Sequence, residues 1–275
     1  MAYPVVSAPY GLKPVNLIGG QVFAGSTRML PIQYGYATSI FYGDMVNIIR
    51  GSIVKNTSTT DSSAAGLTGV FLGCSYTNPA TKQKTFSQYW PASTLAGDAM
   101  AVICDDPDTV FKVVICSATT VIASGSIAVV GQNLGLIQNA GNANTGDSAV
   151  AALYSSTLTT SGFGLRVVDV VRDTQVALGT AVWSSTSTAT LTLTSSSAAA
   201  LPLGTDVASI AANGQLIGSG SFVATAAAAG ATTVVLNTAP QTAFTTAATL
   251  VFTQYPEVLV KINFGSHQYY TATAV

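Results

Sequence analysis

Charged side chains are scarce in this sequence. Of its 275 residues, 10 are Lys or Arg and 11 are Asp or Glu, so 8% are charged, whereas a soluble domain usually carries about 25%. The formal net charge of −1 leaves no basic surplus for binding nucleic-acid phosphates. Intrinsic disorder is excluded as well, because it requires low hydrophobicity and this chain is 48% hydrophobic. We expect a folded protein that binds no nucleic acid.

Residue types that often act in catalysis, such as histidine, glutamate and cysteine, are also few. The chain has one histidine, His267, and one glutamate. No Gly-x-Ser-x-Gly nucleophile elbow stands in a strand–turn–helix context, so His267 is interpreted as a polar residue at a strand end or an interface. Cys74, Cys104 and Cys116 lack the Cys-x-x-Cys spacing of zinc and redox sites. We interpret them as buried, unpaired thiols, which fits a reducing cytoplasm.

The one cluster of carboxylates is Asp105-Asp106-Pro107-Asp108. It lacks the spacing, the central glycine and the bidentate glutamate of a calcium loop, and it is typical of a turn in which Pro107 sets φ and Asp108 caps the next segment. A glycan-cleaving enzyme would need a carboxylate pair across a cleft, for which these aspartates are poor candidates. The sequence predicts a protein that is not an enzyme, with no catalytic residue, cofactor or metal ion.

Long apolar runs are missing too. The mean hydropathy of +0.46 is high, but Gly, Ser, Thr or Asn interrupts each apolar run within about ten residues, and a spanning helix needs roughly 20. The start, MAYPVVSAPYG, lacks the basic and apolar regions of a signal peptide. We expect no membrane contact and no export through the general secretory route.

Small hydroxyl residues are abundant, with 27 Ser and 36 Thr. Threonine suits strands, and short strand-like runs alternate with turn residues at even spacing from 27 to 172, as in a sandwich or barrel. The predicted strands are Thr27–Gln33, Asp44–Ile49, Ser52–Lys55, Gly69–Cys74, Lys84–Tyr89, Met100–Cys104, Val110–Cys116, Asn133–Gln138 and Leu165–Val171. A short helix is predicted near Ser148–Leu153. The near-zero net charge favours self-association.

Charge also marks a boundary, because Asp206 is the only charged residue between Thr174 and Pro256. The charged, alternating pattern returns in Val258–Phe264. We predict an all-β protein with three parts: an N-terminal arm (1–26), a main β-barrel or sandwich domain (27–173 plus 255–275), and an inserted small β-sandwich, immunoglobulin-like domain (174–254). Within the insert, Ala189–Val207 resembles Thr232–Leu250 at an offset of 43, which indicates a duplicated strand–loop–strand unit.

The arm is rich in Pro, Gly and aromatic residues, and its prolines favour extended backbone. A floppy terminus is the alternative. Tyrosine and tryptophan anchor interfaces at small entropic cost, although core filling is the alternative for these aromatics. The predicted protein-interaction residues are Tyr3, Pro4, Tyr10, Leu12, Tyr89 and Trp90.

The chain also contains a series of distinctive sequence blocks: Ala8–Val15, Gly19–Arg28, Ile40–Asp44, Val70–Thr77, Phe86–Pro91, Asp105–Phe111 and Leu165–Val168, with Val258–Phe264 and His267–Tyr269 near the end. In this order they resemble a family of structural proteins of marine and freshwater tailed phages, of the podovirus-like kind that infects cyanobacteria. The insert carries none of these blocks. The resemblance gives no catalytic residues to carry over.

The resemblance implies a virion protein on the capsid surface, assembled in the host cytoplasm. In particular it implies a head decoration (cement) protein that sits as a homotrimer between capsomers, with the major capsid protein and itself as partners. A tail or fibre component that contacts host glycans is the alternative. For an apolar, proline-rich arm, the expected mode of binding is alignment along an exposed strand edge of a neighbour.

Overall fold

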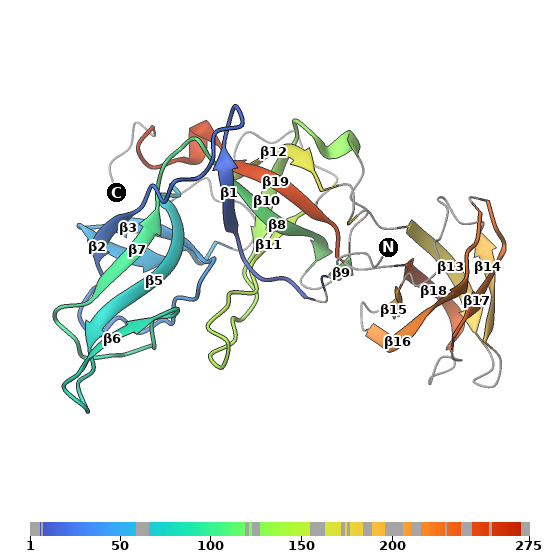
Figure 1. Ribbon diagram of the computed structural model, residues 1–275, viewed down its shortest axis with the longest axis horizontal. Coiled ribbons are helices and arrows are strands. Elements are labelled where there is room, and N and C mark those ends of the chain that lie inside the picture. The colour runs from blue at the N-terminus through green and yellow to red at the C-terminus, as the bar shows by residue number, and fades with distance from the viewer. Residues whose placement is uncertain are drawn as a thin grey trace. The chain divides into compact units, whose positions relative to one another are not determined.

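The computed structural model describes residues 6, 8–58, 66–118, 121–122, 127–154, 163–171, 174, 177–183, 189–195, 206–210, 216–228, 230–237, 244–252 and 255–270. The regular structure in these ranges is β-strand with short 3₁₀ turns, which confirms the all-β fold class. The chain forms two compact units (Figure 1). The main unit contains Ala8–Thr119, Ile127–Val170 and Val258–Val275, and the barrel unit contains Met1–Ser7, Thr120–Ser126 and Val171–Glu257.

One sheet of the main unit has the strand order β2-β7-β5-β3-β4, with β6 paired to β5. Its strands are β2 (Arg28–Pro31), β3 (Met45–Ile49), β4 (Ser52–Lys55), β5 (Gly69–Thr77), β6 (Lys84–Ser87) and β7 (Met100–Cys104). Arg50 and Gly51 connect β3 to β4 with φ of 49° and 80°, the paired positive values that suit a tight hairpin. A parallel bridge from Ile32 to Ile53 links the end of β2 to β4, so the sheet curls toward closure.

The interior of this curled sheet is apolar. In β7, Ala101 and Ile103 point inward and are fully buried, while Met100 and Val102, which alternate with them, are partly exposed. This is the period of two expected of a strand. The core cluster is Ile32, Ile40, Val46, Ile53, Phe71, Cys74, Tyr76, Trp90, Ala96, Ala99, Ala101 and Ile103. Each large side chain in it stabilises the fold by about 1.5–3 kcal/mol through burial.

The other sheet of the main unit follows the order β1-β8-β11-β10-β12-β19, and a further pairing of β8 with β19 returns it to β8. Its strands are β1 (Lys13–Leu17), β8 (Thr109–Ala118), β10 (Asn133–Ile137), β11 (Ala151–Leu153), β12 (Leu165–Val170) and β19 (Glu257–Ile262). The short elements are β9 (Val121–Ile122) and the 3₁₀ turns Ile127–Val129 and Phe264–Ser266.

Two local predictions are wrong. The segment predicted as a helix near Ser148–Leu153 contains β11, which pairs antiparallel with β10 and parallel with β8; these two ladders outweigh the helix propensity of Ala149 to Ala152. The predicted arm is not a free extension over its described part, because β1 pairs antiparallel with β8, with Lys13 opposite Lys112. Residues 8–17 therefore belong to the folded main unit.

A buried carboxylate ties the two sheets of the main unit together. Asp44 is fully buried and accepts hydrogen bonds from the Phe41 N–H at 2.8 Å and from the Ser148 hydroxyl at 2.6 Å. Lys55 supplies the opposite charge at 2.8 Å. Because Ser148 precedes β11 and Asp44 precedes β3, this network joins segments about a hundred residues apart, and each bond to a buried charge is typically worth about 1.5–3 kcal/mol.

Gly11 permits the chain to pass close to this network. Its φ is +80°, and a Cβ atom there would meet the Ser148 Cβ at 2.7 Å and the Gly43 carbonyl oxygen at 2.8 Å. The backbone bonds Gly11 N–H to Val150 O (3.1 Å) and Leu12 N–H to Gly43 O (3.0 Å) hold the approach. A side chain at position 11 would be strained in conformation and in contact.

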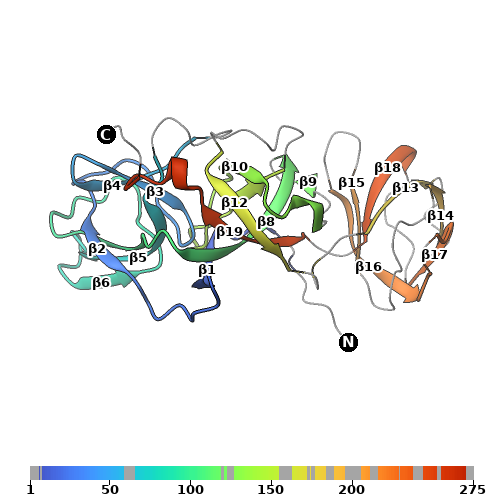
Figure 2. The same ribbon diagram turned by 90° about the horizontal axis from the view of Figure 1, so that it is seen from above.

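The barrel unit is a closed barrel with the order β13-β14-β17-β16-β15-β18 (Figure 2). Its strands are β13 (Ala177–Trp183), β14 (Thr190–Ser195), β15 (Asp206–Ile210), β16 (Leu216–Thr225), β17 (Thr233–Leu236) and β18 (Phe244–Phe252). For the insert, the sequence predicts a two-sheet, immunoglobulin-like sandwich, and this prediction is wrong. The pairing of β13 with β18 closes the six strands into one barrel, so there are no two separate sheets. In β14, Leu191 is buried between exposed Thr190 and Thr192, as alternation predicts.

The two halves of the barrel are arranged symmetrically. Leu191 pairs with Val234 between β14 and β17, and Ala208 pairs with Val251 between β15 and β18. Both pairs are separated by the 43 positions of the sequence repeat. The repeat therefore places equivalent residues opposite each other in two ladders, as a pseudo-twofold axis would.

The barrel segment begins and ends at neighbouring positions of one ladder. Val170 of β12 pairs with Val258 of β19, and the Val171 N–H donates to the Glu257 carbonyl at 3.0 Å. The Glu257 N–H in turn donates to the Thr174 hydroxyl at 2.8 Å. The barrel segment thus stands where a hairpin turn would otherwise connect β12 to β19.

Candidate interaction surface

Two of the predicted interaction residues lie in the core. Leu12 and Trp90 have no exposed surface. Trp90 packs edge-on against Tyr76 with ring centroids 5.3 Å apart, and its backbone exchanges hydrogen bonds with Ile40 at 2.7 and 3.2 Å. Both side chains therefore fill the interior of the main unit, the alternative role for such residues, and they present nothing to a partner in this form of the protein.

Two others are partly exposed. The Tyr10 ring lies under the Lys13 ammonium at 4.7 Å from its centroid, and Tyr89 stacks on Phe41 with centroids 5.5 Å apart and rings 13° from parallel. Each ring keeps an accessible side while a neighbour holds it in place. Tyr3 and Pro4 lie outside the described residues.

Exposed apolar side chains surround the end of β1. Val15, Ile18 and Val22 are 44%, 45% and 83% exposed. The turn between them is fixed by a hydrogen bond from the Leu17 N–H to the Gln21 carbonyl at 2.8 Å. We call these three side chains the β1 patch. Three exposed aliphatic side chains in one strand end and its turn make this segment a candidate contact for a partner.

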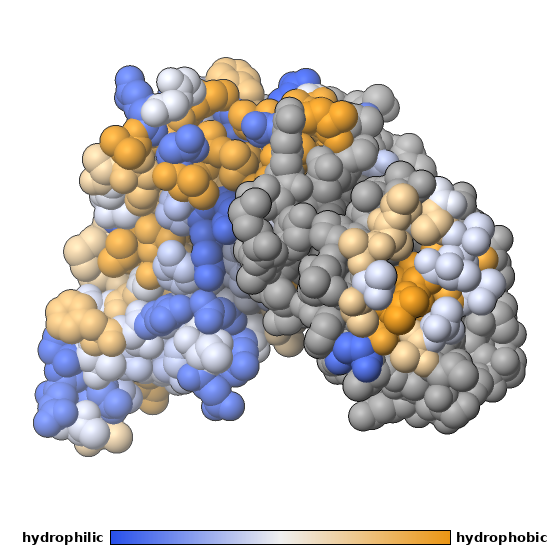
Figure 3. Space-filling view, turned by 45° about the vertical axis from the view of Figure 1, so that its right-hand side comes forward, coloured by the Kyte–Doolittle hydropathy of each residue, from blue (hydrophilic) through white to orange (hydrophobic). Residues whose placement is uncertain are grey.

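A larger apolar surface lies on the outer face of the curled sheet. Strand register places Pro31, Met100, Ser75 and Phe86 in one row across β2, β7, β5 and β6. A second row contains Met29, Val102 and Gly73. Phe86 is 82% exposed and Met29 is 53% exposed. We call the surface formed by these rows and Leu72 the Phe86 face; Figure 3 shows that hydrophobic residues gather in patches on the surface of the protein.

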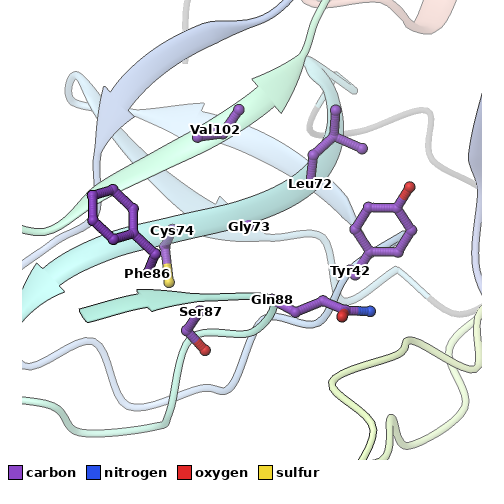
Figure 4. A pocket seen from close by; sticks show the side chains of 8 residues that line it. All are labelled: Tyr42, Leu72, Gly73, Cys74, Phe86, Ser87, Gln88 and Val102. Atoms are coloured by element: carbon purple, nitrogen blue, oxygen red, sulfur yellow. The ribbon is translucent and has the colours of Figure 1, made fainter.

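A shallow groove crosses the Phe86 face (Figure 4). It has a volume of about 500 Å³ and is lined by Tyr42, Leu72, Gly73, Cys74, Phe86, Ser87, Gln88 and Val102. Gly73 lies between Phe86 at one end and Tyr42 at the other. Its φ of +145° accompanies a bulge, where the register of β5 against β7 shifts between Phe71 and Gly73. The bulge and the missing side chain together form the hollow.

Two carboxylates near the ends of the groove are held by hydrogen bonds. Asp98 accepts the Thr77 N–H at 2.9 Å and Lys84 Nζ at 2.9 Å. These hydrogen bonds hold the pKa of Asp98 well below its ordinary value, and the bond from the Thr77 N–H has the largest effect. At the other end, Asp147 accepts a hydrogen bond from the Gln88 amide at 3.0 Å. A partner that covers the Phe86 face would desolvate little unpaired charge.

The C-terminal segment forms a further aromatic surface. Phe264 and Tyr270 stack with centroids 4.3 Å apart and are 66% and 49% exposed. A small hollow of about 90 Å³ beside them is lined by Pro107, Asp108, Lys261, Ile262, Phe264, His267 and Tyr270. Lys261 Nζ lies 3.6 Å from the Asp108 carboxylate.

His267 lies beneath this surface and is fully buried. Its Nδ1 accepts the Tyr269 N–H at 3.2 Å, and burial lowers the pKa of its imidazole below the ordinary value.

The Asp105–Asp108 cluster forms the predicted turn. Asp106 rather than Asp108 closes this turn, by accepting the Asp108 N–H at 2.9 Å. Asp105 instead binds Arg28, 2.6 Å from its Nε, and the Tyr269 hydroxyl.

The three cysteines are free and buried, as the sequence indicates. Burial raises the pKa of the Cys74 and Cys116 thiols to about 12, so both remain protonated and unreactive at neutral pH. No group of three or more His, Cys, Asp or Glu side chains with metal-binding geometry occurs among the described residues.

The sequence does not indicate Met29 as a surface anchor, and it draws attention to Phe86 only as one of three aromatic residues before Pro91, beside Tyr89 and Trp90. Phe86 belongs to the predicted strand Lys84–Tyr89, and alternation alone places it on the face opposite Thr85 and Ser87. What it could not show is which face is covered, because that depends on the pairing of β6 with β5. Residue spacing along one strand carries no information about the row that crosses four strands.

The described part of the chain contains no helix with the length and apolar character that crossing a bilayer would require. Comparison with protein-family models, with curated proteins and with solved structures found no match.

Proposed function

We propose that this chain is a structural protein of a tailed-phage virion that decorates the head, binds the major capsid protein between capsomers and stabilises the shell. The blocks that resemble phage structural proteins support the proposal. All of those between residues 8 and 170 fall in the main unit, where they supply Val15 and Val22 of the β1 patch and Leu72, Gly73, Ser75 and Phe86 of the Phe86 face.

The observation that carries the proposal is the presence of two separate apolar surfaces on one unit. The β1 patch is formed by a strand end and its turn, and the Phe86 face by four other strands. A protein that binds a single ligand needs one such surface, whereas a component of a lattice must contact both the lattice and its neighbours. The proposed homotrimer and the position on the capsid surface belong to this same proposal.

The part of the arm available for capsid binding is smaller than the sequence suggests. Residues 8–17 are bound within the main unit, so we assign capsid contact to the β1 patch and the accessible side of Tyr10 rather than to Leu12. In β1, Lys13, Pro14, Asn16 and Leu17 pair with β8. On the other edge an antiparallel bridge joins Asn16 to Val22, so we assign binding of a strand of the shell protein to the edge at Lys13–Val15.

Virion stoichiometry and localisation test this function. Quantitative mass spectrometry of purified virions should find the chain in a copy number comparable with that of the shell protein, and cryo-electron microscopy should show its two β units on the head. Density confined to the tail, or a few copies per particle, would overturn the proposal.

A second candidate, a tail or fibre component that contacts host glycans, is favoured by the stacked Phe264–Tyr270 pair beside Asp108 and Lys261. Aromatic faces flanked by polar groups suit a sugar ring. Titration with neutral hexoses and N-acetylhexosamines, followed by nuclear magnetic resonance, would show shifts at these residues that Tyr270→Ala removes. Absence of shifts together with head localisation would leave the decoration role alone.

A further inference from the structure

The Phe86 face carries a protrusion and a hollow side by side. The phenyl ring of Phe86 stands out from β6 with 82% of its surface exposed. Next to it lies the groove, whose middle is Gly73 and whose other walls include Leu72, Val102 and Tyr42. The groove, of about 500 Å³, is shallow and widely open to solvent, so an aromatic side chain of a partner can enter it.

A surface of this kind is complementary to itself. When two copies meet through a twofold axis, each residue i that contacts j is matched by j contacting i. A ring and a hollow on one face can therefore engage reciprocally, with the Phe86 of each copy in the groove of the other. If the hollow lay on a different face, the same contact would instead produce a ring or a fibre.

The charge pattern permits this contact. None of the eight lining residues is charged, and Lys84 and Asp98 at the rim already neutralise each other. Asp147, at the other end of the groove, is held by the neutral Gln88 amide, so the twofold contact has to keep the two Asp147 carboxylates apart, and the formal net charge of −1 adds little repulsion at long range.

The size of the face determines the strength of the contact. Four strands spaced about 4.8 Å apart and two rows of side chains cover on the order of 300 Å² per copy. This area is well below the roughly 800 Å² per partner of a standard stable interface. The contact is therefore weak between free molecules and forms where copies are crowded or held side by side.

We propose that the Phe86 face is a weak, twofold contact between two copies of this chain, in which each Phe86 side chain occupies the groove of the partner beside Leu72 and Val102. The contact does not depend on the function proposed above. It is compatible with a trimer made through other surfaces, because a twofold contact of this kind would connect one trimer to the next.

Sedimentation of the full chain from about 10 μM to about 1 mM tests the contact. The weight-average mass of the wild type should rise toward that of a dimer, or of paired trimers if the chain is trimeric. Phe86→Ser should lose this rise and keep the circular dichroism spectrum of the wild type. Leu95→Ser is the matched control, because Leu95 is 58% exposed and belongs to neither the Phe86 face nor the β1 patch, and it should associate as the wild type does.

A charge-complementation pair tests the twofold geometry itself. Phe86→Lys and Leu72→Glu should each fail to self-associate, whereas their mixture should form a heterodimer, since one contact becomes a Lys–Glu pair and the other remains Phe against Leu. Association of wild type that Phe86→Ser leaves unchanged, a wild type that shows no rise at about 1 mM, or a mixture that stays dissociated would overturn the proposal.

Discussion

Leu191 lies opposite Val234 in the ladder between β14 and β17, and the two residues are equivalent positions of the 43-residue repeat. Ala208 and Val251 have the same relationship between β15 and β18. Because the equivalent strands of the two halves pair with each other, neither half forms a closed structure alone. The barrel is complete only when both halves are present.

The barrel unit should fold by itself. Every ladder of its six strands is internal to Val171–Glu257, so a fragment comprising residues 171–257 should give a cooperative thermal transition and dispersed amide resonances. A fragment that ends after β15, at residue 213, should remain unfolded, because the partners of β14 and β15 are missing. A folded short fragment would contradict the closed-barrel arrangement.

Two N-terminal truncations should differ sharply. Removal of residues 1–7 leaves the main unit intact, whereas removal of residues 1–14 deletes Leu12 from the core and two paired positions from β1. Loss of a buried leucine alone typically costs about 2–5 kcal/mol. Urea denaturation should show near-normal stability for the shorter truncation and a large loss, or insolubility, for the longer one. Equal stabilities would refute the assignment of residues 8–14 to the folded unit.

Gly11→Ala should destabilise the protein more than Gly19→Ala. Both glycines have a positive φ, +80° and +91°, but a Cβ atom at Gly11 meets three atoms within 3 Å while one at Gly19 meets nothing within 4 Å. We expect a loss of about 1 kcal/mol at Gly19 from backbone conformation alone, and about 3 kcal/mol or more at Gly11. Chemical denaturation measures both, and the difference isolates the contact with Ser148 and Gly43.

Stability should fall on mild acidification because of His267. Burial lowers its pKa in the folded protein, an effect opposed by Asp105 and Asp106 and reinforced by Lys261. In mild acid, His267 therefore binds a proton in the unfolded chain but not in the folded chain. The free energy of unfolding decreases as pH falls below about 6.5. The melting temperature should drop between about pH 7 and about pH 5.5.

His267→Asn is the matched variant for this test, since an asparagine oxygen can replace Nδ1 as acceptor for the Tyr269 N–H but does not titrate. The variant should be less stable at neutral pH and should show a flatter dependence of melting temperature on pH over the same interval. An unchanged slope would assign the acid sensitivity to other groups.

The strands of the main unit were largely predictable, and their pairing was not. Ser52–Lys55 and Met100–Cys104 begin and end as alternation and turn residues indicate. The burial of Trp90 could not be predicted, because an aromatic residue before a proline has the same local pattern in a core as at an interface; its contact with Tyr76 depends on how distant strands meet. Closure of the barrel likewise depends on a ladder between β13 and β18, which lie far apart in sequence.

The position of the barrel segment also sets an order of synthesis and folding. β19 completes the sheet that begins with β1 by pairing with β12, yet it emerges from the ribosome after the whole of Val171–Glu257. Closing a long unstructured loop costs conformational entropy that rises with its length, but a folded barrel holds its two ends together at the Val171–Glu257 hydrogen bond. We therefore expect mutations that slow closure of the barrel to delay the pairing of β19 with β12, and nascent chains to expose in the interval the edge of β12 that faces away from β10.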